Sequence, residues 1–253
     1  MQTTPNTVAE LATAFPQSIM VMERLGIDYC CKGKQTIEQA CSERGITADE
    51  LLTLINAAPK PSTSDSTWDH EPMSAIITFI VDTHHRYTRE ALLMLSKVAM
   101  KVRQVHGANH EELQLVEKLI QEMSDDLIPH MLKEEQVLFP YIDAMEDASM
   151  VGKEPPVPFF GTARNPIRMM MLEHEVVGEK LLEIRTLTAN FTLPPEACTS
   201  YRTLFTKLEE IEQDLHRHIH VENNILFPRA IEWEEKARIT PIGAAFNDNC
   251  CAK

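Results

Sequence analysis

One pattern of residues occurs twice in this chain. Residues 130–140 and residues 218–228 both fit His-x3-Glu-x3-Leu-Phe-Pro. In this alignment His130 and Glu134 correspond to His218 and Glu222. Side chains four residues apart lie on the same face of an α-helix, so each His–Glu pair points in one direction. The repeat therefore predicts two equivalent helices in two related halves of one domain.

The segments around the two copies have the composition and the periodicity of long helices. Glycine accounts for only 8 of the 253 residues, whereas leucine, methionine, glutamate and alanine are plentiful, which favours helix. Four long amphipathic segments follow one another with short connections. We therefore predict an all-α protein whose main domain, residues 71–236, is an up-down four-helix bundle. The predicted helices span residues 71–104, 109–146, 163–190 and 195–236.

A small helical domain is predicted to precede the bundle, in residues 1–58. Thr36 and Thr47 stand where N-caps are expected, and an earlier helix is expected to stop at Gly26. Between these helices, residues 28–34 (Asp-Tyr-Cys-Cys-Lys-Gly-Lys) form a tight, charged turn that contains two cysteines. Residues 59–70 are assigned to a linker because proline, serine and threonine dominate their first part. Residues 237–253 are expected to be a flexible tail.

A histidine interrupts the apolar stripe of each predicted bundle helix. These histidines are His84, His130, His174 and His218, and Glu134 and Glu222 interrupt two of the stripes as well. A single histidine on an apolar face is more often a hydrogen-bonded core residue than a metal ligand. Here all four helices contribute one, and burying the carboxylates without partners would cost on the order of several kcal/mol each. Metal ions remove that penalty, so the pattern predicts a metal site inside the bundle.

Several neighbouring residues compete for a place in this site. His216 and His220 fall off the apolar stripe and are expected to be solvated or to lie behind the ligands. His85 lies about 100° around the helix from His84 and is not the first choice. Asp126 and Glu173 could contact a ligand, or could equally be solvated helix charges. Glu135 and Glu175 are expected at the surface.

The inferred donor set contains four imidazoles, two carboxylates and no thiolate. Such donors suit iron, manganese or zinc, and the lack of thiolates argues against a structural zinc site. Two glutamates on opposing helices can each bridge two ions, which gives each ion two histidines and two bridging oxygens. The carboxylates contribute a charge of −2 against about +4 from two ferrous ions, so the predicted site is under-neutralised.

Charge and cysteine content restrict the possible partners and location. The formal charge of −14 argues against a nucleic-acid partner, which requires a basic surface. No apolar run has the length that spans a bilayer, and the first residues lack the features of a secretory signal. We therefore expect a cytoplasmic protein with no membrane partner, whose six cysteines remain thiols.

The order His…His-x3-Glu…His…His-x3-Glu resembles that of the hemerythrin-like di-iron proteins. The turn with Cys30, Cys31 and Gly33 resembles the short domain attached to such bundles in the iron-sulfur cluster repair family. The resemblance implies a homodimeric protein with two non-heme iron ions bridged by Glu134 and Glu222. Its implied role is to restore iron-sulfur proteins damaged by nitric oxide or oxidants by supplying iron. The iron ligands carried over are His84, His130, Glu134, His174, His218 and Glu222.

Two questions stay open from the sequence. The bundle could instead reduce nitric oxide enzymatically, or bind nitric oxide or oxygen as a sensor. Cys30 and Cys31 could handle iron or a nitrosyl group, since neighbouring lysines favour thiolate, or they could be packed in an ordinary turn. Cys250 and Cys251 have no counterpart in the bundle pattern.

Overall fold

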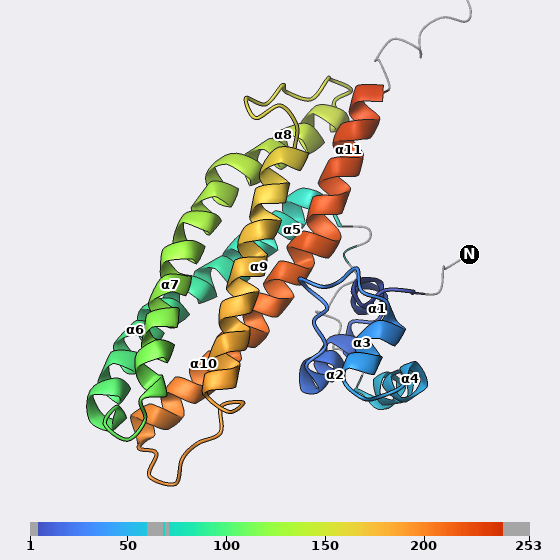
Figure 1. The fold of residues 1–253 in the computed structure, drawn as a ribbon. Helices are drawn as coiled ribbons and strands as arrows, with labels where there is room; N and C mark the ends of the chain where they lie inside the picture. The colour runs from blue at the N-terminus through green and yellow to red at the C-terminus, as the bar shows by residue number, and fades with distance from the viewer. Residues whose placement is uncertain (1–4, 60–67, 69–70, 240–253) are drawn as a thin grey trace, which may run out of the picture.

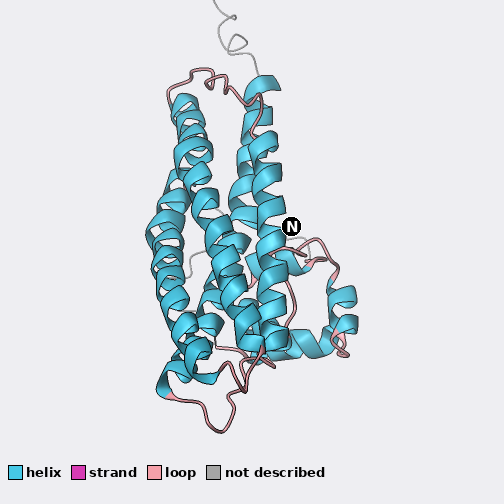
Figure 2. Cartoon of the chain, turned by 60° about the vertical axis from the view of Figure 1, so that its left-hand side comes forward, coloured by secondary structure: helices cyan, strands magenta, loops and turns pink. Residues whose placement is uncertain are grey.

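The computed structural model describes residues 5–59, Trp68 and residues 71–239, and the regular elements within these ranges are helices. The predicted all-α class is confirmed (Figure 2). Residues 59–70 lie mostly outside the described ranges, as do Cys250 and Cys251. Residues 237–239 were assigned to the tail but belong to the last helix, which ends at Ile239.

Four long helical rods form the bundle, and consecutive rods run in opposite directions (Figure 1). The first rod is α5 (Met73–Phe79), η2 (Ile80–His85) and α6 (Arg86–His106); the second is α7 (Glu112–Lys133), η3 (Glu134–Leu138) and α8 (Phe139–Met150); the third is α9 (Arg164–Leu187); the fourth is α10 (Thr199–Val221), η4 (Glu222–Leu226) and α11 (Phe227–Ile239). The η segments are π-helical turns, each of which inserts one extra residue into an otherwise α-helical rod.

Two of the π-turns coincide with the repeated motif. Pro140 and Pro228 follow η3 and η4 within two residues. A proline inside a helix has no N–H to donate, and its ring crowds the carbonyl of the residue four positions earlier. Those carbonyls belong to Gln136 and Asn224, which lie inside the two π-turns. The Leu-Phe-Pro sequence thus explains why each rod widens at the residue that carries the repeated glutamate.

Two apolar clusters fill the bundle on either side of a polar band. One cluster joins the α6, α7, α9 and α10 rods toward one end and includes Leu95, Leu119 and Leu208. The other joins α5, α8, α11 and the start of α9, and it includes Ile80 and Ile142. The repeated histidines and glutamates lie between the clusters along each rod, so the polar band is closed off from both ends of the bundle.

The small domain consists of α1 (Val8–Ala14), α2 (Gln17–Leu25), α3 (Ile37–Glu43) and α4 (Ala48–Ala57). Thr36 and Thr47 cap α3 and α4 through reciprocal side-chain bonds, and Gly26 ends α2 with φ of 66°. All three predictions are confirmed. The domain packs beside the fourth rod (Figure 1), and Ile219 of α10 belongs to its apolar core.

Candidate metal centre

Six potential donors converge inside the polar band, and each is at most 1% exposed. They are His85, His130, Glu134, His174, His218 and Glu222. They form two groups of four residues, one containing His85 and His218 and the other containing His130 and His174. Glu134 and Glu222 belong to both groups. Each group therefore offers two imidazoles and a share of two carboxylates.

The prediction that His84 takes part is wrong, because the structure places His85 in that position. Glu146 accepts the backbone N–H of Met73 and Glu234 accepts that of Ala163, so these residues mark equivalent starts of the first and third rods. His174 follows Ala163 by eleven residues, whereas His85 follows Met73 by twelve. The π-turn η2 absorbs the extra residue, and α9 has no such turn.

His84 nevertheless lies close to the centre. Its Nδ1 atom is 3.0 Å from Oδ1 of Asp214, and its ring stacks on that of His218 at a centroid distance of 5.4 Å. It belongs to neither group of donors. In the sequence, only its position next to His84 pointed to His85. The periodicity of a regular α-helix, without a π-turn, favoured His84 instead.

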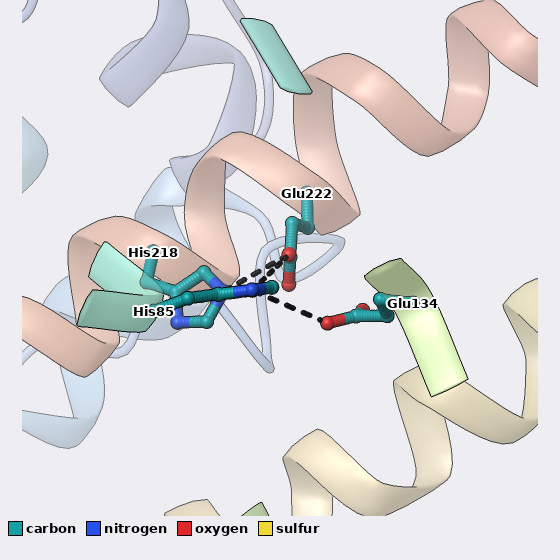
Figure 3. A group of neighbouring side chains, drawn as sticks. All are labelled: His85, Glu134, His218 and Glu222. Atoms are coloured by element: carbon teal, nitrogen blue, oxygen red, sulfur yellow. Dashed lines mark hydrogen bonds and ion pairs between the residues drawn. The ribbon is translucent and has the colours of Figure 1, made fainter. Parts of the chain in front are cut away.

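The first group is drawn in Figure 3. Nε2 of His85 lies 3.2 Å from Nε2 of His218 and 3.4 Å from Oε2 of Glu134. Oε1 of Glu222 lies 2.9 Å from Nε2 of His218. The Nε2 atoms and carboxylate oxygens thus face one point, the arrangement that a cation requires.

The second group repeats this arrangement with the other oxygen of Glu222 and the same oxygen of Glu134. Nε2 of His130 lies 3.0 Å from Nε2 of His174, and Oε2 of Glu222 lies 3.2 Å from Nε2 of His174. Oε2 of Glu134 is 3.4 Å from Nε2 of His130. Glu222 therefore presents one oxygen to each group, as a bridging carboxylate does.

The Nδ1 atoms of three imidazoles face acceptors outside the groups. His85 donates to Glu135 over 2.6 Å, and His130 to Glu173 over 2.8 Å. Such contacts fix the tautomer that leaves Nε2 free to bind a metal and raise the basicity of the ligand. Glu173 therefore contacts His130, one of the six potential metal ligands. Glu135 was expected at the surface; its side chain is 24% exposed there and also contacts His85.

The third acceptor is the amide oxygen of Asn223, 3.0 Å from Nδ1 of His174. Asn223 is not among the site residues predicted from the sequence. Within the described residues, Nδ1 of His218 has no hydrogen-bond partner. Asp126 pairs with Lys180 on the outside of the bundle and contacts none of the six donors.

The electrostatics of the buried group favour a cation. Both oxygens of Glu134 and Oε2 of Glu222 are buried, and within the described residues the contacts of the two Oε2 atoms with imidazoles, at 3.2 to 3.4 Å, are ion pairs without hydrogen-bond geometry. Burial lowers the pKa of His85, but the carboxylates of Glu134 and Glu222 outweigh it and raise the pKa to about 10. In the same way, burial is outweighed by Glu134 and Glu173 at His130, whose pKa rises to about 10. Protons and metal ions therefore compete for the same atoms, and the nitrogen and oxygen donors fit iron, manganese or zinc.

His216 and His220 serve a different purpose from the one predicted. Nδ1 of His216 lies 3.0 Å from Glu23 of the small domain. His220 is buried, which lowers its pKa to about 4, and it packs against the ring of Tyr29. Neither belongs to the two donor groups. Both face the small domain, so they connect the two domains and are not simply solvated.

Cys30 and Cys31 lie against the third and fourth rods. Both backbone N–H groups donate to Oδ1 of Asp28, and the sulfurs are 3.7 Å apart. A hydrogen bond with Cys31 and burial raise the pKa of the Cys30 thiol well above its usual range. The surroundings of Cys30 thus favour the thiol form, whereas the role of Cys30 and Cys31 stays open between a site that handles iron and a packed turn.

Within residues 5–59, 68 and 71–239, the helices are too short or too polar to cross a membrane.

The fold and the buried donors define a hemerythrin-like bundle with a cation-binding interior. Residues 77–230 match the hemerythrin HHE cation binding domain, and residues 4–59 match a domain of unknown function, DUF542. The chain therefore belongs to the hemerythrin HHE family, in the branch where this N-terminal domain precedes the bundle.

Similar curated proteins share both parts. The iron-sulfur cluster repair protein YtfE of Yersinia pseudotuberculosis serotype IB (strain PB1/+) is 36% identical over 227 residues, which cover 88% of this chain and 96% of that protein. The protein of the same name from Yersinia pestis (strain Pestoides F) matches with the same identity and coverage. That from Yersinia pseudotuberculosis serotype O:1b (strain IP 31758) is 34% identical over 224 residues.

Proposed function

We propose that this chain holds two iron ions and uses them to restore damaged iron-sulfur clusters, the role that its relatives' names describe. The observation that supports a dinuclear site is the pair of donor groups that share Glu134 and Glu222. His85 and His218 would hold one ion, and His130 and His174 the other. Bound ferrous iron would supply exchangeable metal and electrons.

The protein's own residues make such a site suited to release as well as to binding. Each ion would receive two nitrogens and two shared oxygens, fewer than the six donors that iron commonly takes. His218 has no acceptor at Nδ1 within the described residues, so its Nε2 is a weaker ligand than those of the supported histidines. Burial between two apolar clusters keeps bulk water from competing for the ion.

The test is transfer of iron to a damaged enzyme. The purified chain is loaded anaerobically with ferrous iron, counted for iron, and mixed with a dehydratase whose four-iron cluster has been degraded by nitric oxide. We expect two irons per chain and recovery of dehydratase activity beyond that given by the same amount of free iron. Two bound irons without recovery would refute repair by iron supply, and no bound iron would refute the metal centre itself.

The closeness of the two donor groups also supports a second candidate, reduction of nitric oxide. Conversion of two molecules to nitrous oxide and water consumes two electrons and two protons, and two adjacent ferrous ions hold two electrons. Continuous nitrous oxide production with an electron donor would favour this activity. Stoichiometric binding of nitric oxide without turnover would contradict it and would leave sensing or repair.

The cytoplasmic location, the homodimer and the damaged iron-sulfur proteins as partners stay predictions. Light scattering of the purified chain tests the dimer directly. A mass corresponding to 28.7 kDa at micromolar concentration would contradict it.

A further inference from the structure

Asn223 connects the donor groups to the cysteine turn of the small domain. Its Oδ1 atom lies 3.0 Å from Nδ1 of His174, and its Nδ2 atom donates to the backbone oxygen of Cys30 over 3.3 Å. The side chain is only 8% exposed. A single buried amide therefore bonds at one end to a predicted metal ligand and at the other end to a different domain.

The two halves of the bundle differ at this position. Asn223 follows the repeated glutamate Glu222, just as Glu135 follows Glu134, and both reach Nδ1 of a histidine on the first helix of their own half. Glu135 makes its second contact with Arg89 of the bundle, at 2.7 Å. The residue after the repeated glutamate therefore makes contacts only within the bundle in the first half, whereas in the second half it also bonds to the small domain.

The cysteine turn fits closely against the bundle around this bond. The thiol of Cys31 donates to the backbone oxygen of His174 over 3.8 Å. A Cβ atom at Gly178 would lie 3.4 Å from the Cys31 sulfur, and one at Gly33 would lie 3.1 Å from Oδ1 of Asn224. The cysteine turn and the bundle therefore lie close together at both glycines, and the Cys31 thiol and the Asn223 amide bond across the same contact.

We propose that Asn223 is a positioning residue that couples docking of the cysteine turn to metal retention at His174, given the metal centre proposed above. The docked turn holds the amide so that its oxygen faces Nδ1 of His174. An ion on Nε2 fixes the imidazole, which in turn fixes the amide and the turn. Because coupling of two equilibria is reciprocal, the ion protects the turn to the same degree that the turn retains the ion.

The test measures both directions of this coupling in the full chain. Iodoacetamide labelling of the peptide with Cys30 and Cys31 is followed by mass spectrometry, anaerobically, with and without two equivalents of ferrous iron. Loss of iron to a ferrous chelator is followed in parallel. We expect iron to slow labelling in the unaltered chain by about tenfold, within the range typical of coupled sites.

Three variants separate the two ends of the amide. Asn223→Ala should make labelling independent of iron and speed the loss of one of the two irons by roughly tenfold or more. Asn223→Asp keeps an oxygen for His174 but replaces the N–H donor to Cys30 with a second oxygen. This variant should retain iron, and iron should no longer slow its labelling. Asn224→Ala is the matched control, because Asn224 bonds to the backbone oxygen of Tyr29 at 3.1 Å but does not contact His174. It should speed labelling in both states and leave the effect of iron unchanged.

Two results would overturn the coupling while leaving the metal centre intact. One is iron-independent labelling in a chain that binds two irons. The other is protection that persists in Asn223→Ala, which would indicate direct contact between iron and the sulfurs. Failure to bind iron at all would refute the proposed function instead, and the iron count distinguishes these cases.

Discussion

At the scale of single residues, the choice between His84 and His85 shows what decides membership of the site. Both are buried, at 4% and 0% exposure, and both lie near His218. The two histidines differ in which carboxylate their ring nitrogens face. Nε2 of His85 is within 3.4 Å of Glu134, whereas the closest carboxylate to His84 is Asp214, outside the donor groups.

This difference predicts opposite effects for two adjacent substitutions. His85→Ala should lose about one of the two irons per chain, because it removes one of two imidazoles from a group. His84→Ala should keep both irons and lose only packing and its bond to Asp214. Iron is counted by plasma mass spectrometry, with helicity checked by circular dichroism. Equal iron loss in two folded variants would contradict the assignment.

Cys198 offers a second prediction at this scale. It is exposed at the start of α10, and the hydrogen bond with Nε2 of His106, at 3.2 Å, lowers its pKa to about 7. Because the thiolate is the reactive form, its alkylation rate should rise with pH and reach half its maximum near pH 7. His106→Ala should move that midpoint upward by more than one pH unit. Cys41, whose pKa burial raises, should react slowly at pH 7 and is the internal control; an unmoved midpoint in His106→Ala would contradict the pairing.

At the scale of helices, the π-turns decide which residues the sequence could and could not identify. Five of the six donors follow from the repeated motif and from a regular helical stripe. The sixth donor, His85, could not be predicted in this way. No proline marks η2 in the sequence, and a regular period of 3.6 residues does not allow for one inserted residue. Asn223 was missed for a related reason: it follows a ligand, where a regular helix places it about 100° away from the site.

Deleting one residue tests this account of η2. Removal of the exposed Asp82 shortens the distance from Met73 to His85 to that found in α9, so the rod can become regular α-helix and iron should be retained. Removal of the exposed Arg168 is different, because α9 has no π-turn that could absorb the loss of one residue. The deletion rotates one side of the helix against the other, so either His174 or Ile167 must leave its buried position. Iron should then fall to about one per chain or less. Iron count and thermal unfolding measure both, and loss of iron on deleting Asp82 would contradict the role of the π-turn.

Glu146 allows a prediction about how the first rod begins. Its carboxylate is 3% exposed and accepts the backbone N–H groups of Met73 and Ser74, at 2.9 and 3.0 Å. Glu146→Ala leaves a buried donor without a partner, which should lower the free energy of unfolding by about 1–3 kcal/mol. Urea denaturation measures the change. The exposed Asp147 is a suitable control, and equal effects of the two alanine substitutions would contradict the capping role.

At the scale of the whole molecule, two domains and two apolar clusters enclose one polar band. The order of helices and the presence of a separate N-terminal domain were predictable because they depend on local periodicity, caps and breaks. The docking position of the cysteine turn was not predictable, because it depends on contacts between residues nearly 200 positions apart, such as Glu23 with His216. Those contacts place a thiol pair beside one of the two donor groups.

The buried charges of this band lead to a prediction about the stability of the metal-free chain. His85 and His130 have pKa values of about 10 when folded, against 6.5 when unfolded. Between these values the folded chain binds more protons than the unfolded chain, so stability must fall as pH rises through this window. It should be fully present below about pH 6.5 and lost progressively toward pH 10.

Iron should remove this dependence, because an ion replaces the protons on the same nitrogens. We expect the melting temperature of the metal-free chain to fall by more than about 5 °C between pH 7 and pH 9.5, given roughly 2–4 °C per kcal/mol for a chain of this size. The melting temperature of the iron-loaded chain should change less over the same range. Iron binding at pH 7 should also release protons, which calorimetry in buffers of different ionisation enthalpy can detect. His85→Ala should weaken the fall in the metal-free chain. His216→Ala should weaken it in the metal-free and the iron-loaded chain alike, because burial lowers the pKa of His216 but Glu23 outweighs it and raises the pKa, at a residue outside the donor groups. Equal melting curves for metal-free and loaded chain at both pH values would show that protons and iron do not share these nitrogens.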